Sequence, residues 1–462
     1  MGSYSEYKTI NLPWLTQIPT NWKLIRNKQF LQEKKIIVGN LSNQYTLLSL
    51  TLRGVIKRDL SEKKGKLPSS FDTYKIISPG DIVFCLFDMD ETPRTVGLSE
   101  YDGMLTGAYT VFQVNGINPQ FLYYYYLSLD NIKALRPLYT GLRKTIKTDT
   151  FLALKLPVPP RAEQDQIVRF LDWKVSEINK LIGIRRKEIQ ELEELKAEII
   201  NSAILQGIDS NVVMKKTDVY YLPKIPATWK VIKIKRICKV GASISNQLKK
   251  HTDQDKVVFL PMENISENGK IDCSIKQPIA KVRTGFSSFA KNDVIVAKIT
   301  PCFENGKGAC LDELESDIGY GTTELFNLRA GNDVLPKYLY YITMTKIFRS
   351  LGEGQMTGSA GQKRVPADFI RNFVIGLPSI AIQYKIIDYI CLKTSQINRL
   401  ICTKHKQLEF LKELCSTIIS DVVTGKIDVR NIPVPAYEHV DDMVADGGEG
   451  NDEEPRIPGE ED

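Results

Sequence analysis

Residues 18–25 read IPTNWKLI and residues 225–232 read IPATWKVI, so the chain carries one short segment twice. Three further pairs follow in the same order. They are NPQFLYYYYL (118–127) with LPKYLYYITM (335–344), EINKLI (177–182) with QINRLI (396–401), and Gly207-Ile208-Asp209 with Gly425-Lys426-Ile427-Asp428. Four pairs in one order indicate an internal duplication. The offset grows from 207 to 219 between the first and third pairs, so the globular parts diverge while the later parts keep register.

Each copy begins with short apolar runs between turn residues, a pattern typical of β-strands. The runs are TLLSL (46–50), DIVFCLF (81–87) and YTVFQV (109–114), then VVFLP (257–261), DVIVAKI (293–299) and ELFNLR (324–329). Residues 119–129 and 336–347 each start with a proline and predict short helices. The proline segments LPVPP (156–160) and LPSI (377–380) predict the end of each globular part.

Aromatic residues gather at Tyr123–Tyr126 and Tyr338–Tyr341. Exposed rings could stack on nucleic-acid bases. Helical spacing after a proline favours the alternative, in which these rings pack in the core. Trp22 and Trp229, from the repeated opening segment, are likewise expected to be core residues.

Each copy ends with a long predicted helix. Apolar residues recur there with gaps of 3, 4 or 7, at Leu171, Val175, Ile178, Ile182, Ile189, Leu192, Ile199 and Ala203, and at Ile390, Ile397, Ile401, Leu408, Leu411, Ile418 and Val422. Arg185 and Lys196 occupy two skipped positions of this heptad pattern. About forty residues would span roughly 60 Å. The length of the pattern favours a coiled coil over helices that each pack only on their own globular part.

The expected fold class is therefore α+β, with two globular α/β domains separated by two long antiparallel coiled-coil helices in a pseudo-two-fold internal repeat. The predicted boundaries are 10–160 and 216–380 for the globular domains, 161–215 and 381–432 for the helical regions, and 433–462 for an acidic disordered tail.

Charge is unevenly distributed. The chain has a net charge of +7, yet Tyr437 to Asp462 holds eleven acidic residues and one arginine, which leaves +17 on the remainder. A body this basic suits a nucleic acid, although a generic basic surface would look the same. The tail has the low hydrophobicity and like charge of a disordered segment.

The other compositional signals are negative. Eight scattered cysteines without a CxxC pair indicate reduced thiols and a cytoplasmic location. There is no long apolar run and no signal-peptide pattern at the start, so we expect no membrane contact. The three histidines are far apart, and phosphate-loop and NPPY motifs are absent. We therefore predict no catalytic residue, no metal site and no cofactor.

Two globular halves that each open with a PxxW segment and end in a proline element before a long helix resemble the specificity subunit of type I restriction–modification enzymes. The resemblance covers about residues 10–435, and LPVPPRAEQDQI (156–167) is its most specific piece. The second copy, LPSIAIQYKI (377–386), keeps its first proline and Gln383 but lacks the Pro-Pro pair and the glutamate. The second helix closes with VTGKIDVR (423–430), also typical of this family.

This resemblance implies that each globular half is a target recognition domain for one part of a split, asymmetric site in double-stranded DNA. It implies that the helical regions space these domains and dock two adenine-methyltransferase (M) subunits, which motor–nuclease (R) subunits then join. The chain itself would catalyse nothing. Two alternatives remain open: a stand-alone nuclease or methyltransferase, and a coiled-coil protein scaffold that binds no DNA.

Polar and basic residues that follow predicted strands or lie beside glycine are the candidates for DNA contact. In the first half they are Arg53, Lys57, Arg58, Asp88, Asp90, Thr92, Arg94, Thr95, Arg143 and Lys144. In the second half they are Lys298, Thr300, Glu304, Asn305, Lys307, Thr322, Thr323, Gln362 and Lys363. The segments 87–95 and 297–308 occupy equivalent places, each after a strand. We expect a third to a half of these residues to contact DNA.

Overall fold

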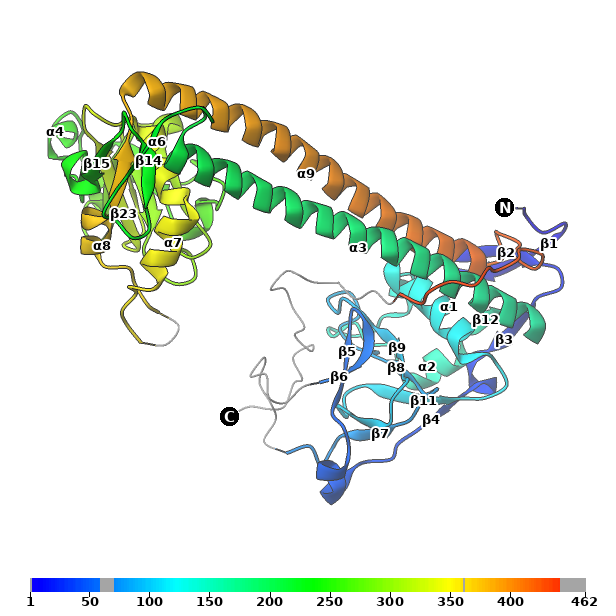
Figure 1. Ribbon diagram of the computed structural model, residues 1–462. Coiled ribbons are helices and arrows are strands. Elements are labelled where there is room, and N and C mark those ends of the chain that lie inside the picture. The colour runs from blue at the N-terminus through cyan, green and yellow to red at the C-terminus, as the bar shows by residue number, and fades with distance from the viewer. Residues whose placement is uncertain (1, 59–69, 360–361, 441–462) are drawn as a thin grey trace. The chain divides into compact units, whose positions relative to one another are not determined.

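The computed structural model describes residues 2–58, 70–359 and 362–440, and the chain divides into two compact units (Figure 1). Unit 1 comprises Met1–Lys187 with Lys404–Asp462, and unit 2 comprises Glu188–Thr403. The chain passes from unit 1 to unit 2 within helix α3 (Arg161–Gln206) and returns within helix α9 (Ile380–Val423). Each unit is therefore a globular domain together with a segment of both long helices.

Unit 1 is built around an antiparallel four-stranded sheet in the order β4-β11-β8-β9. Its strands are β4 (Leu31–Glu33), β8 (Ile82–Phe84), β9 (Val96–Leu98) and β11 (Thr110–Val114). The other strands pair as β1 (Tyr7–Leu12) with β2 (Leu15–Pro19), β3 (Lys23–Arg26) with β12 (Lys155–Val158), β5 (Leu48–Thr51) with β6 (Gly54–Lys57), and β7 (Lys75–Ile77) with β10 (Gly103–Leu105). The helices are α1 (Pro119–Asn131) and α2 (Thr148–Ala153).

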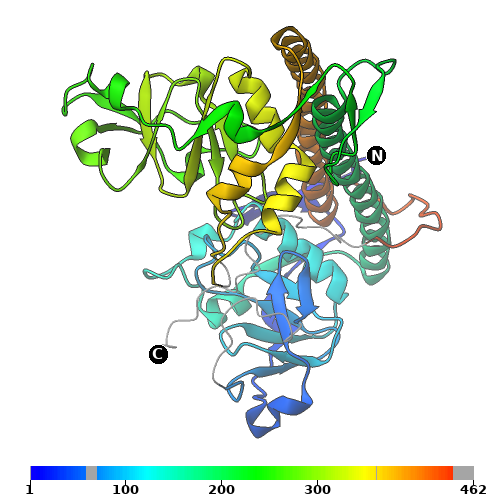
Figure 2. The ribbon, with the colours of Figure 1, turned by 60° about the vertical axis from the view of Figure 1, so that its left-hand side comes forward.

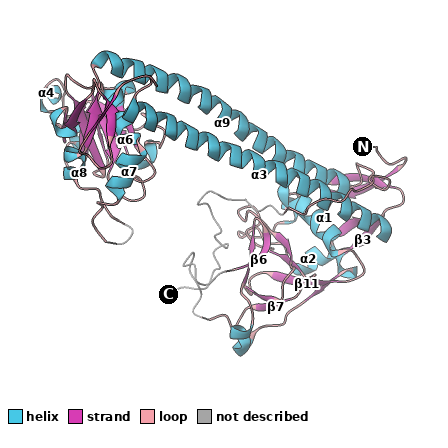
Figure 3. Ribbon diagram, in the orientation of Figure 1, coloured by secondary structure: helices cyan, strands magenta, loops and turns pink. Residues whose placement is uncertain are grey.

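Unit 2 contains a sheet of the same strand order, β16-β23-β20-β21 (Figure 3). Its strands are β16 (Cys238–Val240), β20 (Val294–Ala297), β21 (Gly308–Cys310) and β23 (Leu325–Ala330). A second sheet joins β18 (Lys276–Pro278), β17 (Lys256–Leu260), β22 (Ile318–Gly321) and β19 (Ser287–Ala290), and the remaining pairs are β13 (Met214–Lys216) with β14 (Lys224–Pro226) and β15 (Lys230–Lys233) with β24 (Val374–Leu377). The helices are α4 (Ser245–Leu248), α5 (Ile279–Val282), α6 (Pro336–Met344), α7 (Lys346–Glu353) and α8 (Ala367–Asn372). All six predicted strands are confirmed in the two units.

The helix predicted at 336–347 is wrong in one respect, because it is two helices. Thr345 has an extended backbone, with ψ 141°, and ends α6. Its side chain accepts a hydrogen bond from the backbone N–H of Phe348 and so caps the start of α7. A threonine cap therefore interrupts an apolar pattern that periodicity alone cannot divide.

The aromatic residues lie in the cores, as their spacing predicted. Trp22 and Trp229 are buried, and so are Tyr124–Tyr126 of α1 and Tyr338–Tyr341 of α6. Tyr126 donates its hydroxyl to Asn27 Oδ1 over 2.7 Å, a buried bond that joins α1 to the segment after β3. These rings are packed against protein and are not offered to bases.

The long helices bury the faces that the heptad pattern marked. In unit 1, Leu171 of α3 shares a core with Val422 and Val423 of α9. In unit 2, Ile200 of α3 shares a core with Ile390 of α9. Within each unit the two helical segments lie side by side and run in opposite directions (Figures 1 and 2).

Polar contacts accompany this packing. Lys196, at a skipped heptad position, donates to Asn398 Oδ1 of α9 over 3.4 Å and to Asn268 Oδ1 over 2.7 Å. Residues that the sequence assigned to the tail contact α3 as well, because Asn179 Nδ2 donates to the carbonyl oxygen of Val440. The rest of the predicted tail, 441–462, lies outside the described residues. No helix in the described part of the chain is long and apolar enough to cross a membrane.

Candidate nucleic-acid interface

In unit 1, three segments that are far apart in the sequence come together. They are the β5–β6 hairpin, the loop 87–95 after β8, and the turn 140–145. Arg143 NH2 lies 2.9 Å from Asp88 Oδ2, which joins the turn to the loop. Arg94 NH2 donates to the carbonyl oxygen of Leu52 over 3.4 Å, which joins the loop to the hairpin. Four of the predicted residues thus belong to one surface, since Arg53 is exposed at the hairpin tip.

The turn 140–145 is closed by two reciprocal backbone hydrogen bonds of 3.0 Å between Thr140 and Thr145. Lys144 has a positive φ of 42°, as does Asp88 with 44°, and such backbone is uncommon outside glycine. Leu142 at the tip is completely exposed, with a relative accessibility of 103%. The sequence contains no signal for this leucine, because a single apolar residue in a loop has no periodicity.

The acidic residues of the loop hold its cations in place. Asp90 accepts from Arg136 Nε over 2.9 Å and lies 3.2 Å from Lys144 Nζ. The hydrogen bond from Arg136 is the main cause, and that from Lys144 a further one, of a pKa of Asp90 below its usual value. Arg136 was not among the predicted residues. Asp88 and Asp90 are thus partners of basic side chains.

Two predicted residues of this loop are buried. The Thr92 hydroxyl donates to the carbonyl oxygen of Asp88, and the Thr95 hydroxyl donates to Asp130 Oδ1 over 2.6 Å. Their relative accessibilities are 4% and 2%. The expectation that they face DNA is therefore corrected, because both hydroxyls stabilise the loop from inside.

The remaining predicted cations of unit 1 lie on the hairpin. Lys57 Nζ is exposed and lies 4.7 Å from the centre of the Tyr101 ring. Arg58 is half-buried, and its backbone N–H donates to the carbonyl oxygen of Leu47. Lys57 pairs with Leu48 at the open end of the hairpin, whereas Arg53 lies at its tip.

Unit 2 forms a corresponding cluster from the loop 298–307 after β20, the segment 322–324 before β23, and the hairpin 357–364. The Thr300 hydroxyl donates to the carbonyl oxygen of Lys363 over 3.1 Å. Arg364 makes two hydrogen bonds of 2.9 Å to the Glu324 carboxylate. Because Arg364 donates these bonds, the pKa of Glu324 lies below its usual value. Arg364 was missed, although it directly follows the predicted Gln362 and Lys363.

The predicted residues of unit 2 differ in exposure. Asn305, Thr323, Gln362 and Lys363 are exposed, and Glu304 and Thr322 are half-buried. Lys307 Nζ donates to the carbonyl oxygen of Met262 over 3.1 Å, and Lys298 Nζ lies 5.5 Å from the centre of the Phe326 ring. Both lysines are half-buried and contact protein atoms, and their contact with DNA stays a prediction.

A buried arginine that the sequence did not single out positions the loop of unit 2. Arg349 of α7 donates through NH1 to the carbonyl oxygen of Phe303 over 2.8 Å, and through NH2 to that of Gly306 over 3.4 Å. Its guanidinium also lies 4.7 Å from the centre of the Phe303 ring. The loop 303–306 is therefore stabilised by a buried side chain that lies more than forty residues later in the sequence.

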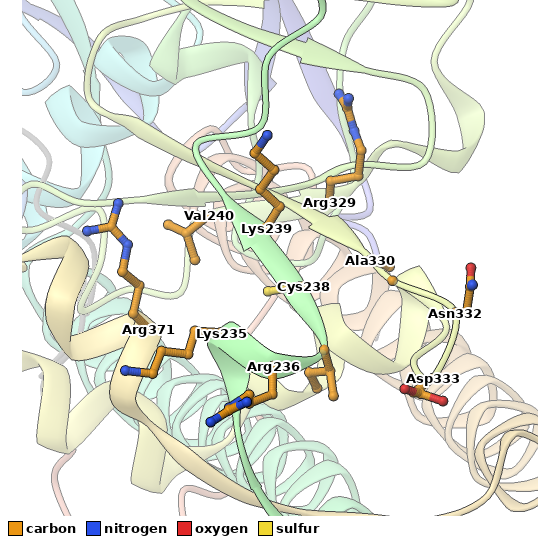
Figure 4. A pocket seen from close by; sticks show the side chains of 12 residues that line it. Lys235, Arg236, Cys238, Lys239, Val240, Arg329, Ala330, Asn332, Asp333 and Arg371 are labelled. Carbon is orange, nitrogen blue, oxygen red and sulfur yellow. The ribbon is translucent and has the colours of Figure 1, made fainter.

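Unit 2 also contains a cavity of about 570 Å³ beside β16 and α8 (Figure 4). Five basic side chains contribute to its lining: Lys235, Arg236, Lys239, Arg329 and Arg371. None of them was among the predicted contacts. Within the described residues, no group of three or more His, Cys, Asp or Glu side chains is arranged to hold a metal ion.

The family model described as "Type I restriction modification DNA specificity domain" matches residues 86–202 and 226–409, which is well over half of the chain. The chain is 40% identical over 168 residues to the type I restriction enzyme EcoAI specificity subunit of Escherichia coli, a match that covers 36% of this chain and 28% of that subunit. It is 34% identical over 194 residues to the EcoEI specificity subunit of the same organism, covering 40% and 32%. The matched regions thus span about three tenths of these two relatives.

A solved structure has the same fold. The solved chain comes from a study of complex assembly and conformational transition of the type I R-M system. It aligns with the present chain with a TM-score of 0.61 at 13% identity, and the alignment covers 89% of the present chain and 99% of the solved one. The fold likeness and the two matched segments agree with each other. The chain therefore belongs to the type I restriction modification DNA specificity domain family.

Proposed function

We propose that this chain is the DNA-sequence-recognition subunit of a type I restriction–modification complex, and that its two halves bind the two parts of one bipartite, asymmetric site in double-stranded DNA. The observation that carries the proposal is the repetition of one polar cluster. In both units it combines the loop after an equivalent strand, β8 or β20, with the turn or hairpin that precedes α2 or α8. Repetition at equivalent places is expected of two domains with one task.

The two clusters differ in the side chains that they offer. Unit 1 exposes Arg53 and Arg143, whereas unit 2 exposes Asn305, Gln362 and Lys363. Arginine and lysine pair with guanine, while asparagine and glutamine pair with adenine. Different side chains at equivalent places favour different half-sites, and hence an asymmetric target. Residues 10–160 and 216–380 are the proposed target recognition domains.

The helical regions 161–215 and 381–432 are the proposed spacer, an antiparallel coiled coil that gives the chain a pseudo-two-fold repeat. They are also the proposed docking surface for two adenine-methyltransferase subunits, which motor–nuclease subunits join. The support is that both helices leave large apolar side chains exposed: Leu181, Ile184, Leu195, Leu392, Leu400 and Phe410. Similar helices present similar faces, and two similar faces suit two copies of one partner.

On this proposal the chain directs catalysis by its partners and contributes no catalytic residue. The test is to reconstitute the full-length chain with its methyltransferase subunits and to map methylated adenines in a genome. A bipartite motif that depends on this chain supports the proposal. DNA cleavage or methylation by the purified chain alone would support the stand-alone enzyme, and the absence of salt-dependent DNA binding would support a scaffold that binds only protein.

A further inference from the structure

The basic cavity of unit 2 lies at the edge strand β16. Lys239 of β16 pairs across the sheet with Arg329 of β23, and Lys235 and Arg236 lie in a 3-10 turn (Ile234–Arg236) that Ile237 separates from β16. Arg371 enters from α8. The only acid in the cavity lining, among the described residues, is Asp333. Five cations around one concave surface form a strongly positive site, seen closely in Figure 4.

Most of these cations are not needed to neutralise the protein's own acids. Arg236 and Lys239 are exposed and make no ion pair within the described residues. Lys235 Nζ donates to a neutral partner, Asn372 Oδ1, over 3.0 Å. Two cations are exceptions: Arg329 forms a close pair with the buried Asp293, and Arg371 NH1 lies 3.2 Å from Asp368 Oδ1. The cavity therefore carries positive charge that the protein's own acidic side chains do not fully neutralise.

The first half of the chain provides an internal comparison. The repeated opening segment places Lys28, Gln29 and Gln32 where unit 2 has Lys235, Arg236 and Lys239. Gln32 pairs with Gln113 in the sheet of unit 1, as Lys239 pairs with Arg329.

Arg371 has a neutral counterpart as well. The carbonyl oxygen of Leu154 accepts from Asn27 N, as that of Phe373 accepts from Ile234 N, which sets Leu152 at the place of Arg371. One cation in unit 1 therefore corresponds to five in unit 2. The same framework forms in both units, so the extra charge is not a requirement of folding.

The cavity is separate from the polar cluster described above. Asp293, the partner of Arg329, directly precedes β20, while the loop 298–307 directly follows it. The two sites therefore flank opposite ends of a four-residue strand, roughly 13 Å long. This strand is shorter than one helical turn of B-DNA, which is roughly 34 Å.

We propose that this cavity binds backbone phosphates of the DNA duplex, outside the loops that contact bases. Lysine and arginine on a concave, exposed surface neutralise phosphates without regard to sequence. The inference rests on the proposed function, and it adds that the halves are unequal: at this edge strand unit 2 supplies phosphate contacts that unit 1 lacks. Recognition of bases stays with the loops.

The test is a double charge reversal, Arg236→Glu with Lys239→Glu, in the full-length chain assembled with its methyltransferase subunits. The matched control is Lys249→Glu with Lys281→Glu, two exposed lysines of unit 2 that do not line the cavity. Binding to a duplex with the recognised site and to one with a scrambled site is measured from about 50 to 200 mM salt.

Loss of two phosphate contacts lowers the slope of log affinity against log salt by about 2, so the wild type loses roughly tenfold more affinity than the variant across this range. The expected result is this fall on both duplexes, with the preference for the recognised site retained and with no change for the control. An unchanged slope, an equal fall in the control, or a loss of site preference would each overturn the inference. If the wild type itself binds no DNA, the proposed function fails and the inference fails with it.

A second variant tests the inference by a gain of DNA affinity, which misfolding cannot produce. Gln29→Arg with Gln32→Lys adds two cations at the exposed equivalent positions of unit 1, and we expect the salt slope to rise by about 2. A last measurement uses a free anion in place of DNA. If inorganic pyrophosphate raises the thermal stability of the wild type but not of the Arg236→Glu/Lys239→Glu variant, while DNA binding is the same in both, the cavity serves a free phosphate compound and the DNA assignment is wrong.

Discussion

Gln164 and Gln383 make the same two hydrogen bonds at the starts of α3 and α9. Gln164 Oε1 accepts from Asn118 N over 2.8 Å, and its Nε2 donates to the carbonyl oxygen of Pro159 over 2.9 Å. Gln383 Oε1 accepts from Leu335 N over 2.9 Å, and its Nε2 donates to the carbonyl oxygen of Pro378 over 3.0 Å. Each glutamine thus ties a proline element to the start of a tyrosine-rich helix, which explains why the degenerate second element retains it.

Replacing Gln383 by leucine removes both bonds, and a third from its Nε2 to the carbonyl oxygen of Asp333, while keeping much of the volume. The part-buried backbone N–H of Leu335 and the buried carbonyl oxygen of Pro378 then lose these partners, and we expect a loss of about 2–3 kcal/mol in the free energy of unfolding. Thermal or urea unfolding measures it. Gln396→Leu, at an exposed position of α9, is the control and should cost less than about 0.5 kcal/mol. Equal effects of the two changes would contradict a structural role for Gln383.

Glu163 has a role in unit 1 that unit 2 does not repeat. It accepts hydrogen bonds from Trp22 Nε1 over 2.7 Å and from the Tyr4 hydroxyl over 2.6 Å, and both bonds are buried. Burial and this bond raise the pKa of Tyr4. Glu163→Ala should lower the free energy of unfolding by about 2–4 kcal/mol, since two buried donors lose their acceptor.

Calorimetry of the Glu163→Ala variant is best compared with that of Glu177→Ala, which changes an exposed residue of the same helix. A Tm equal to that of the control would show that Glu163 contributes nothing.

The Asp172 carboxyl should make stability depend on pH. Burial raises the pKa of Asp172, against the effects of a 2.7 Å bond from the Tyr124 hydroxyl and of nearby His439. A raised folded pKa means that the stability contribution is complete below the unfolded pKa and is lost as pH rises through the folded pKa. Asp172→Asn removes this loss and keeps an acceptor for Tyr124. Urea unfolding from about pH 4 to pH 7 should show that the free energy of unfolding of the variant rises relative to that of the wild type as pH increases. A constant difference across that range would refute the assignment.

Lys363 and Lys307 should behave differently, although both were predicted to contact DNA. Lys363 is exposed on the hairpin 357–364, so Lys363→Ala should weaken DNA binding by a few-fold and leave Tm unchanged. Lys307→Met leaves the carbonyl oxygen of Met262 without its donor and should lower Tm by several degrees. DNA-binding assays and thermal melts of both variants provide the measurement. Weaker DNA binding for the Lys307 variant and a lower Tm for the Lys363 variant would reverse the two roles.

The proposed spacer should change with helix length. Seven residues added to both α3 and α9 preserve the heptad pattern and lengthen each helix by about 10 Å. The half-sites should then lie about three base pairs farther apart, with their sequences unchanged. Methylated adenines in a genome report this separation. An unchanged separation would mean that the helices do not set the spacing.

How much could be predicted depended on the range of the interactions. The duplication, the strands, the tyrosine-rich helices and the heptad positions follow from periodicity, a local property of the chain. Ile397, Ile401 and Leu408 are buried as the pattern predicted, whereas Leu400 and Phe410, which lie outside it, are exposed. Even here a single Thr345 cap divided a predicted helix, because one hydrogen bond outweighed the apolar pattern.

The side chains of the site were only partly predictable. The segments 87–95, 140–145 and 297–308 were chosen correctly as polar loops, but sequence alone could not show that Thr95 bonds to Asp130 or that Lys307 bonds to Met262. Arg349, Arg364 and the five cations of the cavity gave no local signal. By itself the sequence determined a duplicated α+β chain of this family. Only the tertiary structure decided which side chains face solvent, because that depends on partners thirty to sixty residues away, brought into contact by the packing of the sheets and helices.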